Sequence, residues 1–281
     1  LSDFDYILPK ELIAQYPLQE RDKARLMVLG RKRGSIEHKT FLDIIEYLKI
    51  NDLIVINDTK VLPSRLRGER YSGGKAELLL LKRKEGLAFE ALIKPSRVKI
   101  GESIRFNNGA LCGVISAKNE VTFNGVEADA VYCAGVMPLP PYIKRDPQEQ
   151  DDCYYQTVYA ANAGAIAAPT AGLHFTQRLM REIEGAGTKF AALTLHVGHG
   201  TFKPVKSEDI REHKMEPEYF NIPQSAIEAV NAAKENKGRI FAVGTTSLRA
   251  LESYASGNGG GNTDLFIYPG YKFKIADCLL T

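Results

Sequence analysis

Three of the five histidines lie in two short stretches whose residue types could support chemistry. The first stretch, residues 164–175, is predicted to run as a small apolar strand over 165–168, to break at Pro169 and to lead through a small polar loop to His174. A strand of small residues lets a ligand approach the backbone closely. Loops that follow the carboxyl ends of strands are where open α/β sheets bind ligands. We therefore expect a binding site at this loop.

The second stretch, residues 193–202, is predicted to end a strand in a turn that carries His196 and His199. An imidazole titrates near neutral pH, which suits an acid/base or substrate-orienting role for one of these histidines. Neutral imidazoles also suit zinc or iron, but the spacing matches no ligand motif and no carboxylate accompanies it. We expect no metal site. For each histidine, a buried ring with a structural hydrogen bond stays the alternative.

A polar tetrad, Asn57-Asp58-Thr59-Lys60, follows a predicted buried strand at residues 53–56. Asn, Asp and Thr side chains commonly satisfy backbone groups in turns, so an ordered turn is one interpretation. The other interpretation is a cluster of donors, a carboxylate and an ammonium group beside a ligand crevice. The residue types alone leave both open.

A third strand-to-loop junction, Gly244-Thr245-Thr246-Ser247-Leu248-Arg249, is predicted to join a strand at 239–243 to a helix. Backbone N–H groups at a helix start form a natural seat for an anion, and Arg249 could add a bidentate grip. The signal is weaker than a P-loop because that motif's spacing is absent. A capped helix without a ligand is the alternative.

The remaining elements must position these loops. Apolar spacing predicts helices that begin after Thr40 and after Thr176, and others over residues 207–213 and 223–236. Further strands are predicted at residues 26–29, 190–195 and 265–268. Alternation of strands and helices predicts an α/β domain with a mostly parallel sheet flanked by helices.

Helical periodicity disappears between residues 62 and 136. Short β-type runs there predict a small antiparallel barrel or sandwich, with strands at residues 77–81, 88–94, 103–106, 111–116, 120–123 and 128–133. Because helices resume afterwards, we expect this module to be an insertion, residues 62–149, in an α/β domain made of residues 1–61 and 150–281. Cationic side chains on its leading edge either keep edge strands apart or contact nucleic acid; they are Arg65, Arg67, Arg70, Lys75, Lys82, Arg83 and Lys84.

The composition is that of a folded chain, because 281 residues with 44% hydrophobic content can bury a full core. A net charge of +3 lacks the strong basicity of a protein that coats DNA non-specifically. Four scattered cysteines predict reduced, mostly buried thiols, and the charged loop at residues 21–25 is interpreted as solvated surface. No apolar run approaches the roughly 18 residues that span a membrane, and the amino terminus is no signal peptide, so we expect a cytoplasmic protein.

Seven motifs in order resemble those of the S-adenosylmethionine:tRNA ribosyltransferase-isomerase family of queuosine biosynthesis. They extend over essentially the whole chain, which makes the resemblance specific. The motifs are Asn57-Asp58-Thr59-Lys60-Val61; Met137-Pro138-Leu139-Pro140-Pro141-Tyr142-Ile143; Tyr155-Gln156-Thr157-Val158-Tyr159; Ala168-Pro169-Thr170-Ala171-Gly172-Leu173-His174-Phe175; Leu195-His196-Val197-Gly198 with Gly200-Thr201-Phe202; Val243-Gly244-Thr245-Thr246 with Arg249; and Ile267-Tyr268-Pro269-Gly270-Tyr271.

The resemblance implies an α/β domain with an inserted β-barrel, and a reaction in which the ribosyl part of S-adenosylmethionine is transferred to 7-aminomethyl-7-deazaguanine at the wobble position of tRNA. The transferred group is rearranged to the epoxycyclopentane of epoxyqueuosine, and adenine and methionine are released. S-adenosylmethionine is then a consumed substrate, so no cofactor and no metal are expected. The expected partner is the anticodon loop of a tRNA, bound by a monomer with no membrane association.

The proton transfers of that reaction require an acid or base, and the resemblance makes His174, His196 and Asp58 the catalytic candidates. The candidates for substrate binding are Asn57, Thr59, Lys60, Thr170, Gly172, Gly198, Thr245, Thr246 and Arg249, with Arg249 expected to bind the methionine carboxylate or an RNA phosphate. The chain departs from the family pattern at Tyr154, His199 and Glu216, where relatives usually carry Arg, a hydrophobic residue and His. Relatives also continue past Thr281 with an Asn-Phe-His-Leu-Pro segment and a helical tail. The competing function classes are an RNA-binding module without chemistry and a metal-dependent hydrolase.

Overall fold

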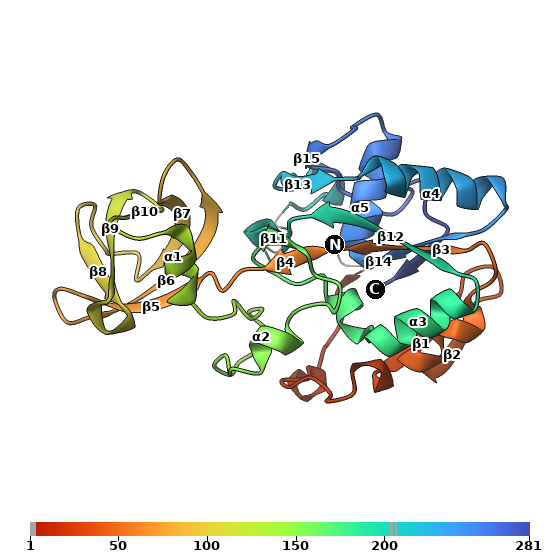
Figure 1. The fold of residues 1–281 in the computed structure, drawn as a ribbon, viewed down its shortest axis with the longest axis horizontal. Helices are drawn as coiled ribbons and strands as arrows, with labels where there is room; N and C mark the ends of the chain where they lie inside the picture. Colours follow the sequence, from red (N-terminus) through yellow and green to blue (C-terminus); the bar gives the residue numbers. More distant parts are fainter. Residues whose placement is uncertain (1–3, 203–204, 206) are drawn as a thin grey trace. The chain divides into compact units, whose positions relative to one another are not determined.

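The structure is a computed structural model that describes residues 4–202, 205 and 207–281. The chain divides into two compact units, each of which is described separately below (Figure 1). Unit 1 comprises Leu1–Lys60, Gln156–Ala163 and Ala168–Thr281, and unit 2 comprises Val61–Tyr155 and Gly164–Ala167. Unit 1 is therefore discontinuous in sequence.

Unit 1 is built on a six-stranded sheet with the order β15-β13-β12-β3-β14-β16. The strands are β3 (Leu53–Asn57), β12 (Lys189–Leu195), β13 (Glu218–Asn221), β14 (Ile240–Val243), β15 (Gly261–Thr263) and β16 (Cys278–Leu280). β12, β3, β14 and β16 are parallel, whereas β13 and β15 add antiparallel pairings at one side. Every residue of β3 and β14 is buried, as expected for parallel strands that are covered on both faces.

Three helices cover this sheet, with α3 (Gln177–Gly185) on the side opposite α4 (Gln224–Glu235) and α5 (Gly244–Ala255) (Figure 1). α3 begins where Thr176 accepts a hydrogen bond from the Leu179 backbone N–H at 3.1 Å, a standard amino-terminal cap. Its buried side chains Leu179 and Ile183 join a core with Ile54, Ile56 and Val243 of the sheet. The predicted α/β architecture with a mostly parallel central sheet is thus confirmed.

The amino-terminal part of unit 1 holds short 3-10 helices and one hairpin. These elements are η2 (Lys10–Leu12), η3 (Arg21–Lys23), β1 (Arg25–Gly30), β2 (Ser35–Thr40) and η4 (Phe41–Tyr47). The helix predicted after Thr40 is a 3-10 helix, in which the Asp43 carboxylate accepts from the backbone N–H and the hydroxyl of Thr40. The interpretation of residues 21–25 as solvated surface is wrong for Asp22, which is 3% exposed and accepts hydrogen bonds from Thr176 and Arg178.

Unit 2 contains a closed antiparallel barrel with the order β10-β7-β6-β5-β8-β9. Its elements are β5 (Arg65–Arg70), β6 (Lys75–Arg83), β7 (Ala88–Lys94), β8 (Ser103–Phe106), η5 (Asn107–Gly109), β9 (Leu111–Ala117) and β10 (Glu120–Phe123). Alternate residues point inward and fill it with large apolar side chains, among them Leu78, Phe89, Ile104, Phe106 and Phe123. Closure leaves no strand edge in the barrel unpaired. The prediction of a barrel is confirmed, although the sequence did not reveal β5.

The strand predicted at residues 128–133 is wrong, because these residues form α1 (Ala128–Cys133). Val131 is fully buried and packs with the barrel core. Ala128 and Val131 stand three positions apart, which places them on one helical face. α2 (Asp151–Tyr154) lies near the end of the first segment of unit 2. β4 (Thr59–Val61) and β11 (Asn162–Ala165) pair as a separate two-stranded sheet, and β11 lies earlier in the sequence than the strand predicted at 165–168.

Two predictions near the carboxyl end of unit 1 are also wrong. The helix predicted at 207–213 is only the 3-10 turn η8 (Ile210–Glu212), because the Asp209 side chain accepts from the Arg211 backbone N–H and side chain instead of continuing a helix. The strand predicted at 265–268 is absent, and β13 pairs instead with β15, which lies just before that segment in the sequence. Phe266 packs edge-on against the His213 ring instead.

The four cysteines are free, but the prediction that they are mostly buried is wrong. Cys112, Cys133 and Cys153 are exposed, and Cys278 is partly exposed. Cys112 faces outward because its neighbours on β9, Leu111 and Gly113, point into the barrel. Within the described ranges, no helix is both long and apolar enough to cross a membrane.

Candidate active site

The carboxyl ends of three adjacent parallel strands meet at one edge of the unit 1 sheet. Asn57 on β3 is in register with Leu193 on β12, and Val55 on β3 with Ala242 on β14. The loops that leave these strands therefore start side by side, and they carry Asp58, His196 and Gly244. This edge is where open α/β sheets place their ligand sites.

Asn57 connects the backbones of β3 and β12. Its side-chain N–H donates to the Leu195 carbonyl at 2.9 Å, and its side-chain oxygen accepts from the Leu195 N–H at 2.9 Å and from the Thr59 N–H at 3.2 Å. The side chain is fully buried. All of these partners are backbone groups, so the structure gives Asn57 a positioning role at the edge rather than a free amide for substrate.

Asp58 forms a triangle of hydrogen bonds with Thr194 and Asn162. The Thr194 hydroxyl donates to Asp58 Oδ1 at 2.7 Å, and Asn162 Nδ2 donates to Asp58 Oδ2 at 3.0 Å and to Thr194 Oγ1 at 3.0 Å. The half-buried carboxylate is thus held in place at the end of β3. Sequence reasoning missed Thr194 and Asn162, although both stand within or beside the motifs of the resemblance.

His196 is held from two sides. Its Nδ1 lies 2.8 Å from Oγ1 of the fully buried Thr59, and its ring stacks on the ring of Tyr219 with centroids 5.6 Å apart. Burial lowers the pKa of His196, and the charge of Asp58 opposes that effect. The imidazole is therefore neutral at neutral pH.

The protonation of the outer nitrogen of His196 depends on the Thr59 hydroxyl. If that hydroxyl donates to the Asn162 carbonyl, 3.5 Å away, its oxygen accepts from Nδ1–H and Nε2 carries the lone pair of a base. If the hydroxyl donates to Nδ1, Nε2 carries the proton and can act as an acid. Among the residues that the structure describes, Nε2 has no hydrogen-bond partner, so this nitrogen is open to a hydrogen bond with a ligand.

His174 lies at the end of η6 (Thr170–His174), the loop after β11 and Pro169. Its ring centroid is 5.3 Å from that of the buried Phe41. Burial lowers the pKa of His174, and a hydrogen bond to the backbone of Arg21 opposes that effect. His174 is thus a second neutral imidazole, but it is anchored against the core and the backbone of η3.

Gly172, in the same loop, is buried against the side chains of Tyr159 and Thr157. A Cβ at Gly172 would lie 2.0 Å from the Tyr159 hydroxyl, so only glycine fits. The Tyr159 hydroxyl and the Thr157 hydroxyl are both buried without a hydrogen-bond partner in the described chain, and burial raises the pKa of Tyr159. Because buried polar atoms are nearly always paired, these two hydroxyls indicate that a polar ligand or water binds here.

The start of α5 contributes two further hydroxyls of the same kind. Gly244 has a positive φ of 83° and its Cβ position would lie 3.3 Å from Thr246 Oγ1 and 3.9 Å from the Cβ of Ala171 in η6. Oγ1 of Thr246 and Oγ of Ser247 are buried without a partner among the described residues. The loop η6 and the first turn of α5 therefore adjoin at Ala171 and Gly244.

Arg249, which was predicted to bind a substrate anion, is paired within the protein in this structure. Arg249 lies in the second turn of α5 and is 8% exposed. Its guanidinium donates to Glu218 Oε2 at 2.5 Å and to the Thr263 carbonyl at 2.6 Å, and Glu218 Oε1 accepts from the Gly198 N–H at 2.8 Å. A carboxylate of the protein therefore occupies the place expected for a substrate anion, and it holds Gly198 as well.

Glu218 is the main residue that sequence reasoning missed. The available signal was weak: an acidic residue at an inward position of β13, whose residues alternate between buried and exposed. Three predicted substrate residues, Lys60, Thr170 and Thr245, are exposed near these strand ends. Their roles stay predictions. Within the described part of the chain, no group of three His, Cys, Asp or Glu side chains is arranged to hold a metal ion.

Comparisons with known proteins agree on one family. A family model described as queuosine biosynthesis protein matches residues 1–281. Curated proteins named S-adenosylmethionine:tRNA ribosyltransferase-isomerase include one from Clostridium kluyveri, 47% identical, and one from a Sulfurihydrogenibium species, 49% identical; each alignment covers 100% of this chain and 86% of the relative. A crystal structure of S-adenosylmethionine tRNA ribosyltransferase from Thermotoga maritima is 33% identical with a TM-score of 0.52, and covers 99% of this chain and 83% of that one.

Proposed function

The chain belongs to the queuosine biosynthesis protein family, and from this premise we propose that it is an S-adenosylmethionine:tRNA ribosyltransferase-isomerase. The observation that carries the proposal is an identity of 47% and 49% to two enzymes of that name over the full length of this chain. The substrates are S-adenosylmethionine and a tRNA that carries 7-aminomethyl-7-deazaguanine at the wobble position. We place the enzyme in the cytoplasm, as a monomer.

The reaction moves the ribosyl part of S-adenosylmethionine to the aminomethyl group of the base and rearranges it to an epoxycyclopentane, with release of adenine and methionine. A base must remove a proton beside the sulfonium, whose positive charge acidifies the neighbouring carbon, and the departing adenine benefits from a proton donor. S-adenosylmethionine is consumed, so it is a substrate rather than a resident cofactor.

We assign the base to Nε2 of His196. The ring is fixed by the buried Thr59 and by Tyr219, and its lowered pKa keeps the imidazole neutral and able to accept a proton. Once protonated, the imidazolium is stabilised by the Asp58 carboxylate, whose charge raises the pKa of His196. The Thr194 hydroxyl and the Asn162 amide hold Asp58 for this role. His174 remains a candidate for the proton donor to adenine.

The partnerless hydroxyls support a site for the polar parts of S-adenosylmethionine. Thr157, Tyr159, Thr246 and Ser247 offer buried donors and acceptors, and Gly172 and Gly244 let the side chains of Tyr159 and Thr246 approach the backbone closely. A ribose hydroxyl, an adenine nitrogen or the methionine amino group would satisfy these groups.

The proposal is tested by incubating the protein with S-adenosylmethionine and a tRNA that carries 7-aminomethyl-7-deazaguanine. Free adenine, free methionine and the matching mass gain on the anticodon base are expected together. The control is the same tRNA with guanine at that position, which lacks the nucleophilic amine. Tight tRNA binding without any adenine release would instead favour an RNA-binding module without chemistry.

A further inference from the structure

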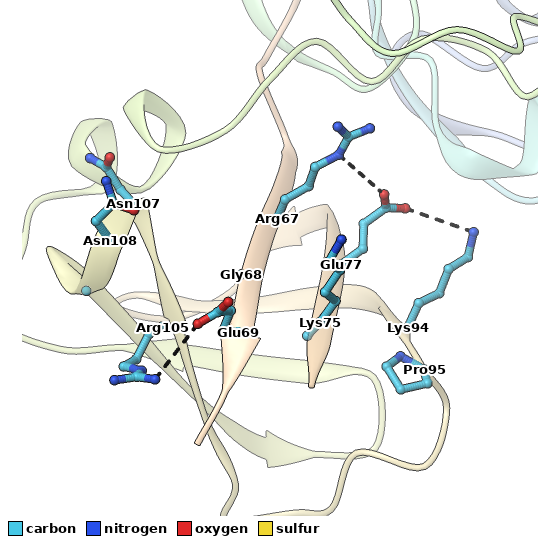
Figure 2. A pocket seen from close by; sticks show the side chains of 12 residues that line it. Arg67, Gly68, Glu69, Lys75, Glu77, Lys94, Pro95, Arg105, Asn107 and Asn108 are labelled. Atoms are coloured by element: carbon cyan, nitrogen blue, oxygen red, sulfur yellow. Dashed lines mark ion pairs between the residues drawn. The ribbon is translucent and has the colours of Figure 1, made fainter. Parts of the chain in front are cut away.

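A groove of about 1000 Å³ opens on the barrel of unit 2, and none of its lining residues belongs to the site described above. It is lined by β5, the start of β6, the end of β7, β8 and η5, and so belongs entirely to one compact unit. Figure 2 shows its charged side chains: Arg67, Glu69, Lys75, Glu77, Lys94 and Arg105. The volume lies at the upper end of the range for small-molecule sites and admits a segment of a polymer.

We propose that this groove binds the ribose-phosphate backbone of the tRNA substrate. The inference rests on the proposed function, which makes a polyanionic RNA the partner of this chain. Four of the charged residues in the lining are cationic and two are anionic, so the groove carries excess positive charge. Arg and Lys side chains in such a groove neutralise phosphates and release counterions, which is the main source of affinity for nucleic acid.

The ion pairs within the groove are loose. Arg67 Nε lies 3.9 Å and Lys94 Nζ lies 4.0 Å from the two carboxylate oxygens of Glu77, and Arg105 lies 4.0 Å from Glu69 (Figure 2). Exposed pairs of this kind contribute little to stability. Little interaction energy is therefore lost when one of these cations leaves its carboxylate to bind a phosphate.

A structural ion pair in the same barrel shows the contrast. Arg70 and Glu102 bond in a bidentate manner at 2.5 and 3.0 Å, with side-chain exposures of only 16% and 17%. Lys75 in the groove is exposed and forms no ion pair with any described residue. Arg67 is the most engaged of the groove cations, because its second nitrogen also donates to Asp146. Lys75, Lys94 and Arg105 are thus more available to a ligand than Arg67.

Polar and aromatic groups beside these cations suit RNA more than a simple anion. Asn107 and Asn108 have positive φ angles of 47° and 53°, which turn the chain at η5 and place two amide side chains in the lining. The Arg105 guanidinium lies 5.1 Å from the ring centroid of Tyr71, which is 69% exposed. An exposed ring next to a guanidinium forms a stacking platform for an unpaired base.

The test measures tRNA binding by the full chain with fluorescently labelled tRNA, without S-adenosylmethionine, over a series of salt concentrations. The groove variant combines Lys75→Gln with Arg105→Gln. The matched control combines Lys99→Gln with Lys118→Gln, two exposed lysines of the same unit outside the groove. Both variants remove two charges from surface positions, so both are expected to fold.

The groove variant is expected to bind tRNA about tenfold more weakly, with the slope of log Kd against log salt reduced by roughly 1.5, because two phosphate contacts are lost. The control variant is expected to bind like the unsubstituted protein. Equal Kd values and equal salt slopes for the groove variant and the control would overturn the proposal. Adenine release, measured separately, tests the proposed function. Groove-dependent tRNA binding without adenine release would support the groove as the tRNA site and contradict the proposed transferase activity.

Discussion

At the scale of single residues, the chemistry depends on how one imidazole is held. Thr59 fixes Nδ1 of His196, and Tyr219 stacks on the ring, while Nε2 remains without a partner in the described chain. His174 is equally neutral but is anchored on Phe41 and on the Arg21 backbone. The two histidines were indistinguishable in the sequence, and the structure separates them.

Replacing His196 by Gln is expected to lower kcat at least a hundredfold, because general base catalysis contributes about 10²–10⁴ in rate. The measurement is adenine release at saturating substrates. Binding of S-adenosylmethionine, followed by calorimetry, should change much less. A variant with unimpaired turnover would remove His196 from the proton transfer.

The pH dependence of kcat/KM should show an acid limb with an apparent pKa below 6.5, the ordinary value for histidine. Burial lowers the pKa of His196, so the ring stays neutral until the pH falls below that value, and activity is lost only when the base becomes protonated. In an Asp58→Asn variant the limb should move to still lower pH, because the carboxylate charge that raises the pKa is gone. An acid limb at the same pH in that variant would contradict the electrostatic coupling between Asp58 and His196.

At the scale of elements, β13 secures the loops on either side of it. Glu218 binds the Gly198 backbone after β12 and the Arg249 guanidinium of α5, and Arg249 reaches the Thr263 carbonyl of β15. The residue that resembles an anion binder in the sequence is thereby a buried tie between four elements.

A Glu218→Gln substitution is expected to destabilise unit 1 by about 3 kcal/mol, because it leaves the Arg249 charge buried without a counterion. Urea unfolding followed by circular dichroism measures the loss. The control is Glu228→Gln on the exposed face of α4, where a change within about 0.5 kcal/mol is expected. Equal stability of the two variants would argue that Arg249 is solvated.

A second buried carboxylate organises the segment that leads into β16. Glu252 of α5 is fully buried and accepts from the backbone N–H groups of Lys274, Ile275 and Ala276 at 2.8 to 3.0 Å. In Glu252→Gln one acceptor becomes a donor that faces an N–H group, so amide hydrogen exchange at these three residues should accelerate at least tenfold. Tyr271→Phe removes the 3.3 Å hydroxyl bond to Glu252 but leaves the three backbone N–H bonds in place, so that exchange should stay nearly unchanged.

At the scale of the whole molecule, each unit carries a buried carboxylate paired with an arginine. Asp52 bonds to Arg239 in unit 1, and Asp151 bonds to Arg145 in unit 2. Burial raises the pKa of each aspartate, but hydrogen bonds from the arginine and from backbone N–H groups outweigh it, so both pKa values lie below the ordinary 3.8. An aspartate whose pKa is lowered in the folded state stabilises the protein at pH values above the ordinary pKa. This stabilisation is lost as the pH falls through the pKa of the folded state.

Both units are therefore expected to lose stability as the pH drops below about 4. Urea unfolding at a series of pH values, with one spectroscopic probe in each unit, measures the effect. In Asp52→Asn the pH dependence of unit 1 should flatten in this range, while that of unit 2 is kept. A slope for unit 1 as steep as in the unsubstituted protein would show that other groups cause the acid loss.

Predictions from the sequence succeeded where the signal was local. The barrel strands at residues 88–94 and 103–106 were found from alternation alone, and the helix after Thr176 from its cap and apolar spacing. The strand predicted at residues 128–133 was wrong because a short apolar segment fits either a strand or a helix. The packing of Val131 on the barrel core favours the helix. The prediction of a strand at 265–268 was wrong because β13 pairs with β15 instead.

The sequence by itself determined the family, the α/β class with an inserted barrel, and the stretches that carry chemistry, because motifs and periodicity are properties of neighbouring residues. Only the tertiary structure decided which of those side chains bond to other groups of the protein. Thr59 meets His196 across 137 positions and Glu218 meets Arg249 across 31. No local pattern encodes such pairings, because they arise when sheet register brings strand ends together and burial makes each polar group find a partner.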